Sequence, residues 1–303
     1  MQLTNILVLA GVLGASAMPS GHAHLHRAAH QQRDMKFYKA EKHFPIPIHA
    51  ATTTSSSVAI PSSTTAPEPA KSSAAVVEEQ DDSNSTDEYV PFCGENKKSK
   101  RVTYAQIMYT GNTGDANGCE WNSNMMTVPK KIADKYHNRM FYTNVADVPY
   151  QVVCANKMGS DHGLNGMFKV ATNKQLVFTL QPGETQIVVA AANTQGVCAF
   201  APEEIPTTVN GQYAGNWAEF DFENSSNGGW SGADCSSLVA QAHDMDVPGC
   251  QICGHDTCST ILPGGFGTNA YTKGMEAEDG IGLNIKDGQQ VTLNVKVGYA
   301  GKD

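Results

Sequence analysis

The segment from Trp217 to Glu223 constrains the fold more than any other, because its side chains alternate strictly between apolar and polar. Ala218, Phe220 and Phe222 point to one side of an extended strand, where we expect a core. The opposite side carries one aromatic and three carboxylates: Trp217, Glu219, Asp221 and Glu223. If exposed, such a face suits a neutral sugar polymer or a cation, and the alternative is an ordinary solvated strand face.

Period-two patterns recur along the chain and predict further strands. Residues 176–180 and 187–189 alternate on either side of a Gln-Pro-Gly-Glu turn, which predicts a hairpin. Residues 281–285 and 291–297 flank an Asp-Gly pair in the same way and predict a second hairpin.

Other elements predicted from the sequence are few and short. Strands are expected at 140–145 and 150–155, and one short helix is expected at about 129–136, where Pro129 occupies the first turn. Many short strands with Gly-, Asn- and Pro-rich turns favour an all-β fold, an antiparallel β-sandwich with short helices and disulfide-stapled loops.

Composition divides the chain into four parts. Residues 1–17 contain an apolar run ending in Ala-Ser-Ala, as in a secretory signal peptide, and residues 18–49 form a histidine-rich leader. Residues 50–88 are Ser/Thr/Pro-rich and then acidic, as in a disordered, O-glycosylated linker. Residues 89–303 are long enough for one well-buried domain. We therefore expect a secreted protein, extracellular or associated with the cell wall.

Two sequons, at Asn84 in the linker and Asn224 after the acidic strand, predict N-glycosylation and an exposed loop after residue 223. The clustered histidines of the leader could bind copper or zinc, but such segments usually do so adventitiously. We therefore expect no metal and no cofactor.

All eight cysteines lie between Cys93 and Cys258, and their even number in a secreted chain predicts disulfides. Residues 250–258 resemble a zinc knuckle in spacing, but an oxidising compartment and the lack of a distant ligand pair favour disulfides. The preferred local bridge joins Cys253 to Cys258. The sequence leaves open the pairing of six cysteines: Cys93, Cys119, Cys154, Cys198, Cys235 and Cys250.

Charge excludes some classes of partner. The formal net charge is −9 and no basic patch is interleaved with aromatics, so nucleic acid is not expected. After residue 17 no segment approaches the ~20 apolar residues that span a bilayer, so no membrane partner is expected.

The acidic strand and the loop after it contain the candidate site. Four acids, Glu219, Asp221, Glu223 and Asp234, could include the acid and base of a glycosidase. The preferred hypothesis is a protein that binds carbohydrate without cleaving it, because tryptophan rings stack on sugars while nearby acids accept hydrogen bonds from the sugar hydroxyls. The candidate carbohydrate-binding residues are Trp217, Glu219, Asp221, Trp230 and Asp234. Core packing is the alternative for each tryptophan.

The chain resembles the secreted allergen-four family of Aspergillus and related filamentous fungi. The similarity is carried by residues 109–128, 156–166, 180–185, 217–238, 251–261 and 279–282. It implies a secreted, IgE-reactive fungal protein, so host IgE is a possible partner.

A partial similarity to thaumatin-like proteins covers Trp-Ala-Glu-Phe, Ala-Asp-Cys-Ser-Ser-Leu-Val and Met-Asp-Val-Pro-Gly. It implies a thaumatin-like β-sandwich with Glu219 and Asp234 as acids of a cleft. We therefore expect a non-catalytic protein that contacts a cell-wall polysaccharide, with β-glucan as the candidate. The alternatives are a glucan hydrolase that uses these two acids and a secreted effector or interaction protein.

Overall fold

Short apolar-polar alternations build two β-sheets in the part of the chain that the computed structural model describes: residues 87–93, 111–115, 119–286 and 288–302. The fold described here belongs to the compact unit that contains residues 88–303. Outside the described residues lie the expected signal peptide (1–17), the leader (18–49), and the linker with Asn84 up to residue 86.

The first sheet has seven strands. Their order is β1 (Met125–Val128), β5 (Thr185–Ala190), β2 (Asn138–Asn144), β13 (Val291–Val297), β9 (Cys250–Gly254), β10 (Thr257–Leu262) and β11 (Phe266–Thr268). Neighbouring strands are antiparallel except for β2 and β13, which run parallel.

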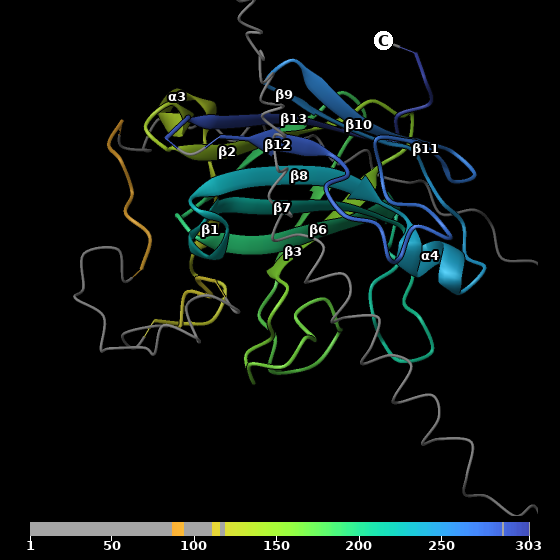
Figure 1. The fold of residues 1–303 in the computed structure, drawn as a ribbon, viewed down its shortest axis with the longest axis horizontal. Helices are drawn as coiled ribbons and strands as arrows, with labels where there is room; N and C mark the ends of the chain where they lie inside the picture. The colour runs from red at the N-terminus through yellow and green to blue at the C-terminus, as the bar shows by residue number, and fades with distance from the viewer. Residues whose placement is uncertain (1–86, 94–110, 116–118, 287, 303) are drawn as a thin grey trace, which may run out of the picture. The chain divides into compact units, whose positions relative to one another are not determined.

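The second sheet has six strands, all antiparallel to their neighbours. Their order is β12 (Leu283–Ile285), β8 (Trp230–Ser236), β7 (Asn216–Asn224), β6 (Thr194–Pro202), β3 (Tyr150–Asn156) and β4 (Leu176–Leu180). Figure 1 shows β2, β9 and β13 in a layer above β8, β7, β6 and β3. The predicted all-β sandwich is confirmed.

The main core fills the space between the two sheets. On β13 the inward residues Val291, Leu293, Val295 and Val297 are buried, and the residues between them are less buried. The second sheet contributes Phe220 and Phe222, whose stacked ring centroids are 5.1 Å apart. This alternation is the period-two pattern that a strand with one buried face requires.

Both predicted hairpins are wrong, although their strands exist. Strand β4 pairs with β3 in the second sheet, whereas β5 pairs with β1 and β2 in the first. The turn between them therefore carries the chain from one sheet to the other, as does the turn between β12 and β13. Alternation shows that a segment is a strand, but it does not identify the pairing partner.

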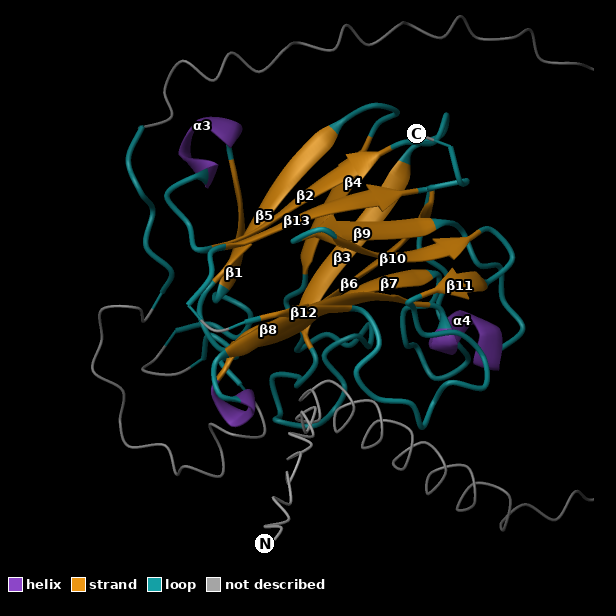
Figure 2. Ribbon diagram, turned by 45° about the horizontal axis from the view of Figure 1, so that its top comes forward, coloured by secondary structure: helices purple, strands orange, loops and turns teal. Residues whose placement is uncertain are grey.

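Helices are short and lie beside the sheets, as Figure 2 shows. The predicted early helix is confirmed as α3 (Lys130–Ala133), with Pro129 at its N-cap. The others are a 3-10 turn, η2 (Ser225–Asn227), and α4 (Leu238–Ala242). None of the helices within the described ranges is long and apolar enough to cross a membrane.

A buried asparagine network joins three segments at one end of the second sheet. Asn124 and Asn156 exchange amide hydrogen bonds of 2.8 Å in both directions. Asn122 accepts from the backbone N–H of Asn156, and Asn124 donates to the carbonyl of Asn112. Because an unsatisfied buried amide is costly, this network fixes Asn112, Asn122 and Asn124 against β3.

A second hydrophobic layer covers the outer face of the six-stranded sheet. Val153, Val197 and Ala199 point outward from β3 and β6 and are fully buried. They are covered by side chains from loops and from α4: Trp121, Met167, Ile205, Tyr213, Ala214 and Val239. The central strands of this sheet are therefore buried on both faces.

Four disulfides link the eight cysteines, and none is free. The predicted Cys253–Cys258 bridge is confirmed. The other pairs are Cys93–Cys119, Cys154–Cys198 and Cys235–Cys250. Cys250 is therefore bonded to a distant cysteine, which is incompatible with the zinc-knuckle alternative.

Buried tyrosines should make the fold sensitive to alkali. Burial, with the negative charge of Asp147, raises the pKa of Tyr150 to about 12, and burial also raises the pKa of Tyr142. A tyrosine in the unfolded chain titrates at about pH 10, so the native state binds the phenolic protons of Tyr142 and Tyr150 more tightly. Stability should therefore be intact below about pH 10 and fall as the pH rises towards about 12. Urea midpoints and tyrosinate absorbance measure this, and titration of every tyrosine near pH 10 in the folded protein would contradict it.

Candidate functional site

The acidic strand β7 lies between β6 and β8, and the sheet register brings its acids together. Glu219 is directly opposite Asp234 of β8, and Asp221 is opposite Gly232. Directly opposed residues have Cβ atoms about 4.5–5.5 Å apart. Glu219 and Asp234 are called the acidic pair below, and the register brings them as close as the hydrolase alternative requires.

The acidic pair is nevertheless buried. Glu219 is 2% exposed and Asp234 is 0% exposed. Lys157 forms an ion pair with Glu219, with 2.6 Å between Nζ and Oε2. The backbone of Gly282 lies so close that a Cβ added there would be 2.7 Å from the Cβ of Asp234. A polysaccharide cannot reach either carboxyl in this arrangement, so the pair does not form an open cleft.

Tyr271 also belongs to this buried region. Burial raises the pKa of its phenol, and the negative charges of Asp234, Glu219 and Asp279 raise it further. The phenol therefore stays protonated at neutral pH. Neither Lys157 nor Tyr271 was among the residues predicted from the sequence, because neither has a motif that distinguishes it from other surface or core residues.

The expectation that Trp217 is exposed is wrong. Its side chain is 9% exposed and packs in the outer hydrophobic layer with Tyr213 and Val239. Its indole Nε1 donates to the carbonyl of Tyr213 at 3.2 Å. The segments that cover the sheet are loops without period-two patterning, so the sequence of β7 alone cannot reveal that its outer face is covered.

Asp221 and Asn224 are also buried, with 3% and 1% exposure. The amide nitrogen of Asn224 donates to Asp221, and its amide oxygen accepts from the backbone N–H and hydroxyl of Ser226. This buried side chain caps η2, which disfavours the N-glycosylation predicted at Asn224. The loop itself is exposed at Ser225, Ser226 and Gly228, as predicted.

Trp230 is the member of the expected site that reaches solvent, with 40% exposure. It lies at the start of β8, two residues before Gly232, so the two residues share one face of the strand. Gly232 belongs to a shallow hollow of about 250 Å³ that includes open solvent. The hollow is lined by Asp221, Asn227, Ser231, Gly232, Ile281, Leu283 and Asn284. We call it the Trp230 hollow.

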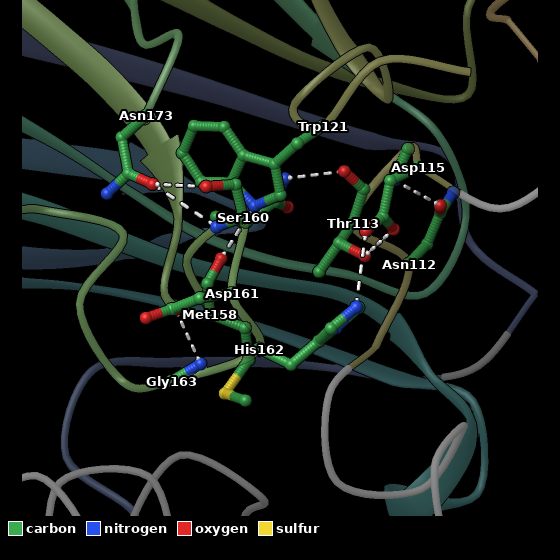
Figure 3. Close-up of polar contacts among 12 residues, drawn as sticks. Asn112, Thr113, Asp115, Trp121, Met158, Ser160, Asp161, His162, Gly163 and Asn173 are labelled. Carbon is green, nitrogen blue, oxygen red and sulfur yellow. Dashed lines mark hydrogen bonds and ion pairs between the residues drawn. The ribbon is translucent and has the colours of Figure 1, made fainter. Parts of the chain in front are cut away.

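A separate polar cluster forms where residues 111–115 meet the loop after β3 (Figure 3). Thr113 donates its hydroxyl to Asp115 at 2.6 Å, and His162 Nε2 lies 3.5 Å from the other oxygen of that carboxylate. In a nucleophilic triad the hydroxyl is hydrogen-bonded to the histidine, whereas here it is hydrogen-bonded to the carboxylate of Asp115. This arrangement orients a surface imidazole but does not activate a nucleophile.

The neighbouring Asp161 has a structural role. Its carboxylate accepts from the backbone N–H of Gly163 and from the amide of Asn165, both at 2.9 Å. These bonds lower its pKa, so the group stays ionised and holds the loop. No three His, Cys, Asp or Glu side chains gather as metal ligands in the part of the chain that the structure describes.

The ion pair between Lys157 and Glu219 should be important for stability. Glu219→Gln would leave the ammonium of Lys157, 12% exposed, without its carboxylate, at an expected cost of about 3 kcal/mol of unfolding free energy. The matched control is Glu204→Gln, because Glu204 and Lys169 form an exposed pair and should contribute less than about 1 kcal/mol. Adding Lys157→Met to Glu219→Gln should restore part of the loss. Urea unfolding measures all three variants, and equal effects of the two Glu→Gln changes would contradict a structural role.

Comparisons with known proteins agree with the family predicted from the sequence. The family model described as "Allergen Asp f 4-like domain" matches residues 123–297. Allergen Asp f 4 of Aspergillus fumigatus is 36% identical over 186 residues, covering 60% of this chain and 56% of that protein. The chain thus spans little more than half the length of that relative.

One solved structure, the protein elicitor MoHrip2 from Magnaporthe oryzae, also matches. The sequence identity is 11% and the TM-score is 0.33, over 54% of this chain and 99% of that chain. The family assignment rests on the sequence matches alone. The chain belongs to the Asp f 4-like allergen family.

Proposed function

We propose that this allergen-like protein is secreted and contacts a neutral cell-wall polysaccharide through the Trp230 hollow. The single observation that carries the proposal is the exposed indole of Trp230, two residues along β8 from Gly232, which lines a polar hollow. Sugar rings present C–H faces that stack on aromatic rings, while their hydroxyls need donors and acceptors nearby.

The lining of the hollow supports a neutral ligand. Asn227 and Asn284 carry amides that both donate and accept, and Ser231 adds a hydroxyl. Asn284 pairs with Gly232 across β12 and β8, so its side chain leaves the sheet beside a residue without one. A net charge of −9 disfavours polyanionic polymers, which leaves neutral polysaccharides such as β-glucan or chitin as the best candidates.

Contact is a better proposal than cleavage. A glycosidase must bring both carboxyls to the scissile bond, and the acidic pair is buried against Lys157 and Gly282. Of the residues in the expected site, the proposed contact surface therefore includes only Trp230 and Asp221, which lines the hollow. Trp217, Glu219 and Asp234 instead support the fold beneath it.

An extracellular location fits the sequence and the covalent structure. The first 17 residues have the pattern of a signal peptide, and four disulfides suit an oxidising compartment. Membership of an allergen family also makes host IgE an expected, though incidental, partner.

Co-sedimentation with insoluble β-glucan and with chitin tests the contact. Trp230→Ala should weaken retention about tenfold, because loss of a stacked ring removes roughly 1.4 kcal/mol. The matched control is Phe266→Ala, because Phe266 is 75% exposed on β11, in the other sheet. Both side chains are exposed, so neither variant should lower the melting temperature by more than a few degrees.

Asn284→Ala provides an independent test of the hollow, because it removes an amide without touching the indole. It should weaken retention less than Trp230→Ala but more than Phe266→Ala. The proposal is wrong if the wild-type protein is retained on neither polymer. It is also wrong if Trp230→Ala and Phe266→Ala have the same effect.

A further inference from the structure

The hairpin of β9 and β10 carries a disulfide across its two strands close to its tip. Cys253 and Cys258 are directly opposite each other in the register, with 4.2 Å between their Cα atoms. The turn beyond them contains His255 and Asp256, which have φ angles of +51° and +61°. Residues other than glycine are strained in this left-handed region, so the bridge closes a turn whose backbone geometry is costly.

Solvent access distinguishes this bridge from a second one of the same topology. Cys154 and Cys198 are also directly opposite each other, on β3 and β6, with 4.0 Å between Cα atoms. Both of those residues are 0% exposed, whereas Cys258 is exposed and Cys253 is half-buried. Thiol–disulfide exchange needs a thiolate to approach a sulfur atom in line, so of these two bridges only the hairpin bridge is open to attack in the folded protein.

We propose that Cys253–Cys258 is a thiol–disulfide exchange site, reduced reversibly by dithiol reductants while the fold is kept. A thiolate of the reductant attacks Sγ of Cys258, the more exposed sulfur, and Cys253 leaves as a thiolate. The second thiol of the reductant then attacks the mixed disulfide and releases Cys258. Two electrons pass to the protein, which gains two thiols once protonated, and the reductant becomes a disulfide.

The surrounding structure makes this reaction local. The bridge spans only five residues in sequence, and β9 remains paired with β13 and β10 after the sulfur–sulfur bond breaks. Closing so short a loop removes little entropy from the unfolded chain, so losing the bridge costs less stability than losing a longer one. The strands also keep the two thiols opposite each other, which favours re-oxidation of the same pair.

The Cys93–Cys119 bridge is also partly exposed, but it closes a sequence separation of 26 residues. A bridge over a longer separation constrains the unfolded chain more, so its loss costs more stability. Reduction of the hairpin bridge should instead loosen residues 250–268 and the start of the following loop. Asn269 links the hairpin to the following loop, because its amide nitrogen donates to the carbonyls of Cys258 and Gly282.

Differential alkylation with peptide mapping tests the proposal on the full oxidised chain, with dithiothreitol as the reductant. Label should enter Cys253 and Cys258 at least ~100-fold faster than Cys154 and Cys198, because the buried pair reacts only after local or global opening. Near-ultraviolet circular dichroism should stay native during the fast step, and removing the reductant should restore the same bridge. The proposal is overturned if Cys253 and Cys258 acquire label only together with Cys154 and Cys198.

A double variant, Cys253→Ser with Cys258→Ser, provides the second measurement. Its hydrogen exchange in residues 250–268 should match that of the wild-type protein after the fast step. Exchange in the double variant that matches the oxidised wild type would mean that the bridge does not restrain the hairpin. If the variant does not fold, reduction of this bridge cannot be compatible with a folded chain, and the proposal fails.

Discussion

The layer of loops packed on the outer face of the six-stranded sheet determines which residues of this protein can meet a ligand. A strand of a sandwich normally has one buried and one solvated face, which produces the alternation seen along β13. On β7 both faces are buried, because Trp217 packs against Tyr213 and Val239 on the outer side. The carboxylates of Glu219 and Asp221, which alternate with its phenylalanines, are thereby removed from solvent.

Burial changes what those carboxylates contribute. An ionised group in a low-dielectric environment must be paired or hydrogen-bonded, and Lys157 meets this need for Glu219. Such a pair adds little net stability compared with apolar residues, but it is costly to break and specifies one arrangement of the covering loops. The same acids on an open surface would be candidates for catalysis, so their chemistry is decided by the loops above them.

The sequence predicted local structure well and long-range structure poorly, for a physical reason. Alternation identified strand β7, and aromatic and β-branched composition identified β2 and β3. Cysteine spacing and the oxidising compartment identified the Cys253–Cys258 bridge. These features depend on neighbours close in the chain. The pairing of β4 with β3 and the covering of Trp217 depend on segments distant in sequence, whose packing no short-range period records. Of the predicted site residues, Trp217, Glu219, Asp221 and Asp234 are therefore buried, and Trp230 is exposed.

The three tryptophans show how the covering layer separates core from contact surface. Trp121 and Trp217 each donate the indole N–H to a loop carbonyl, of Met158 and Tyr213 respectively, and both are less than 10% exposed. Trp230 lies at the end of β8, at the margin of this layer, and within the described residues its N–H has no such loop acceptor. A buried indole needs a hydrogen-bond partner inside the protein, whereas an exposed one can offer its ring and its N–H to a ligand. Trp230 thus offers an exposed ring two residues along β8 from Gly232, and Gly232 lines the hollow together with the amides of Asn227 and Asn284.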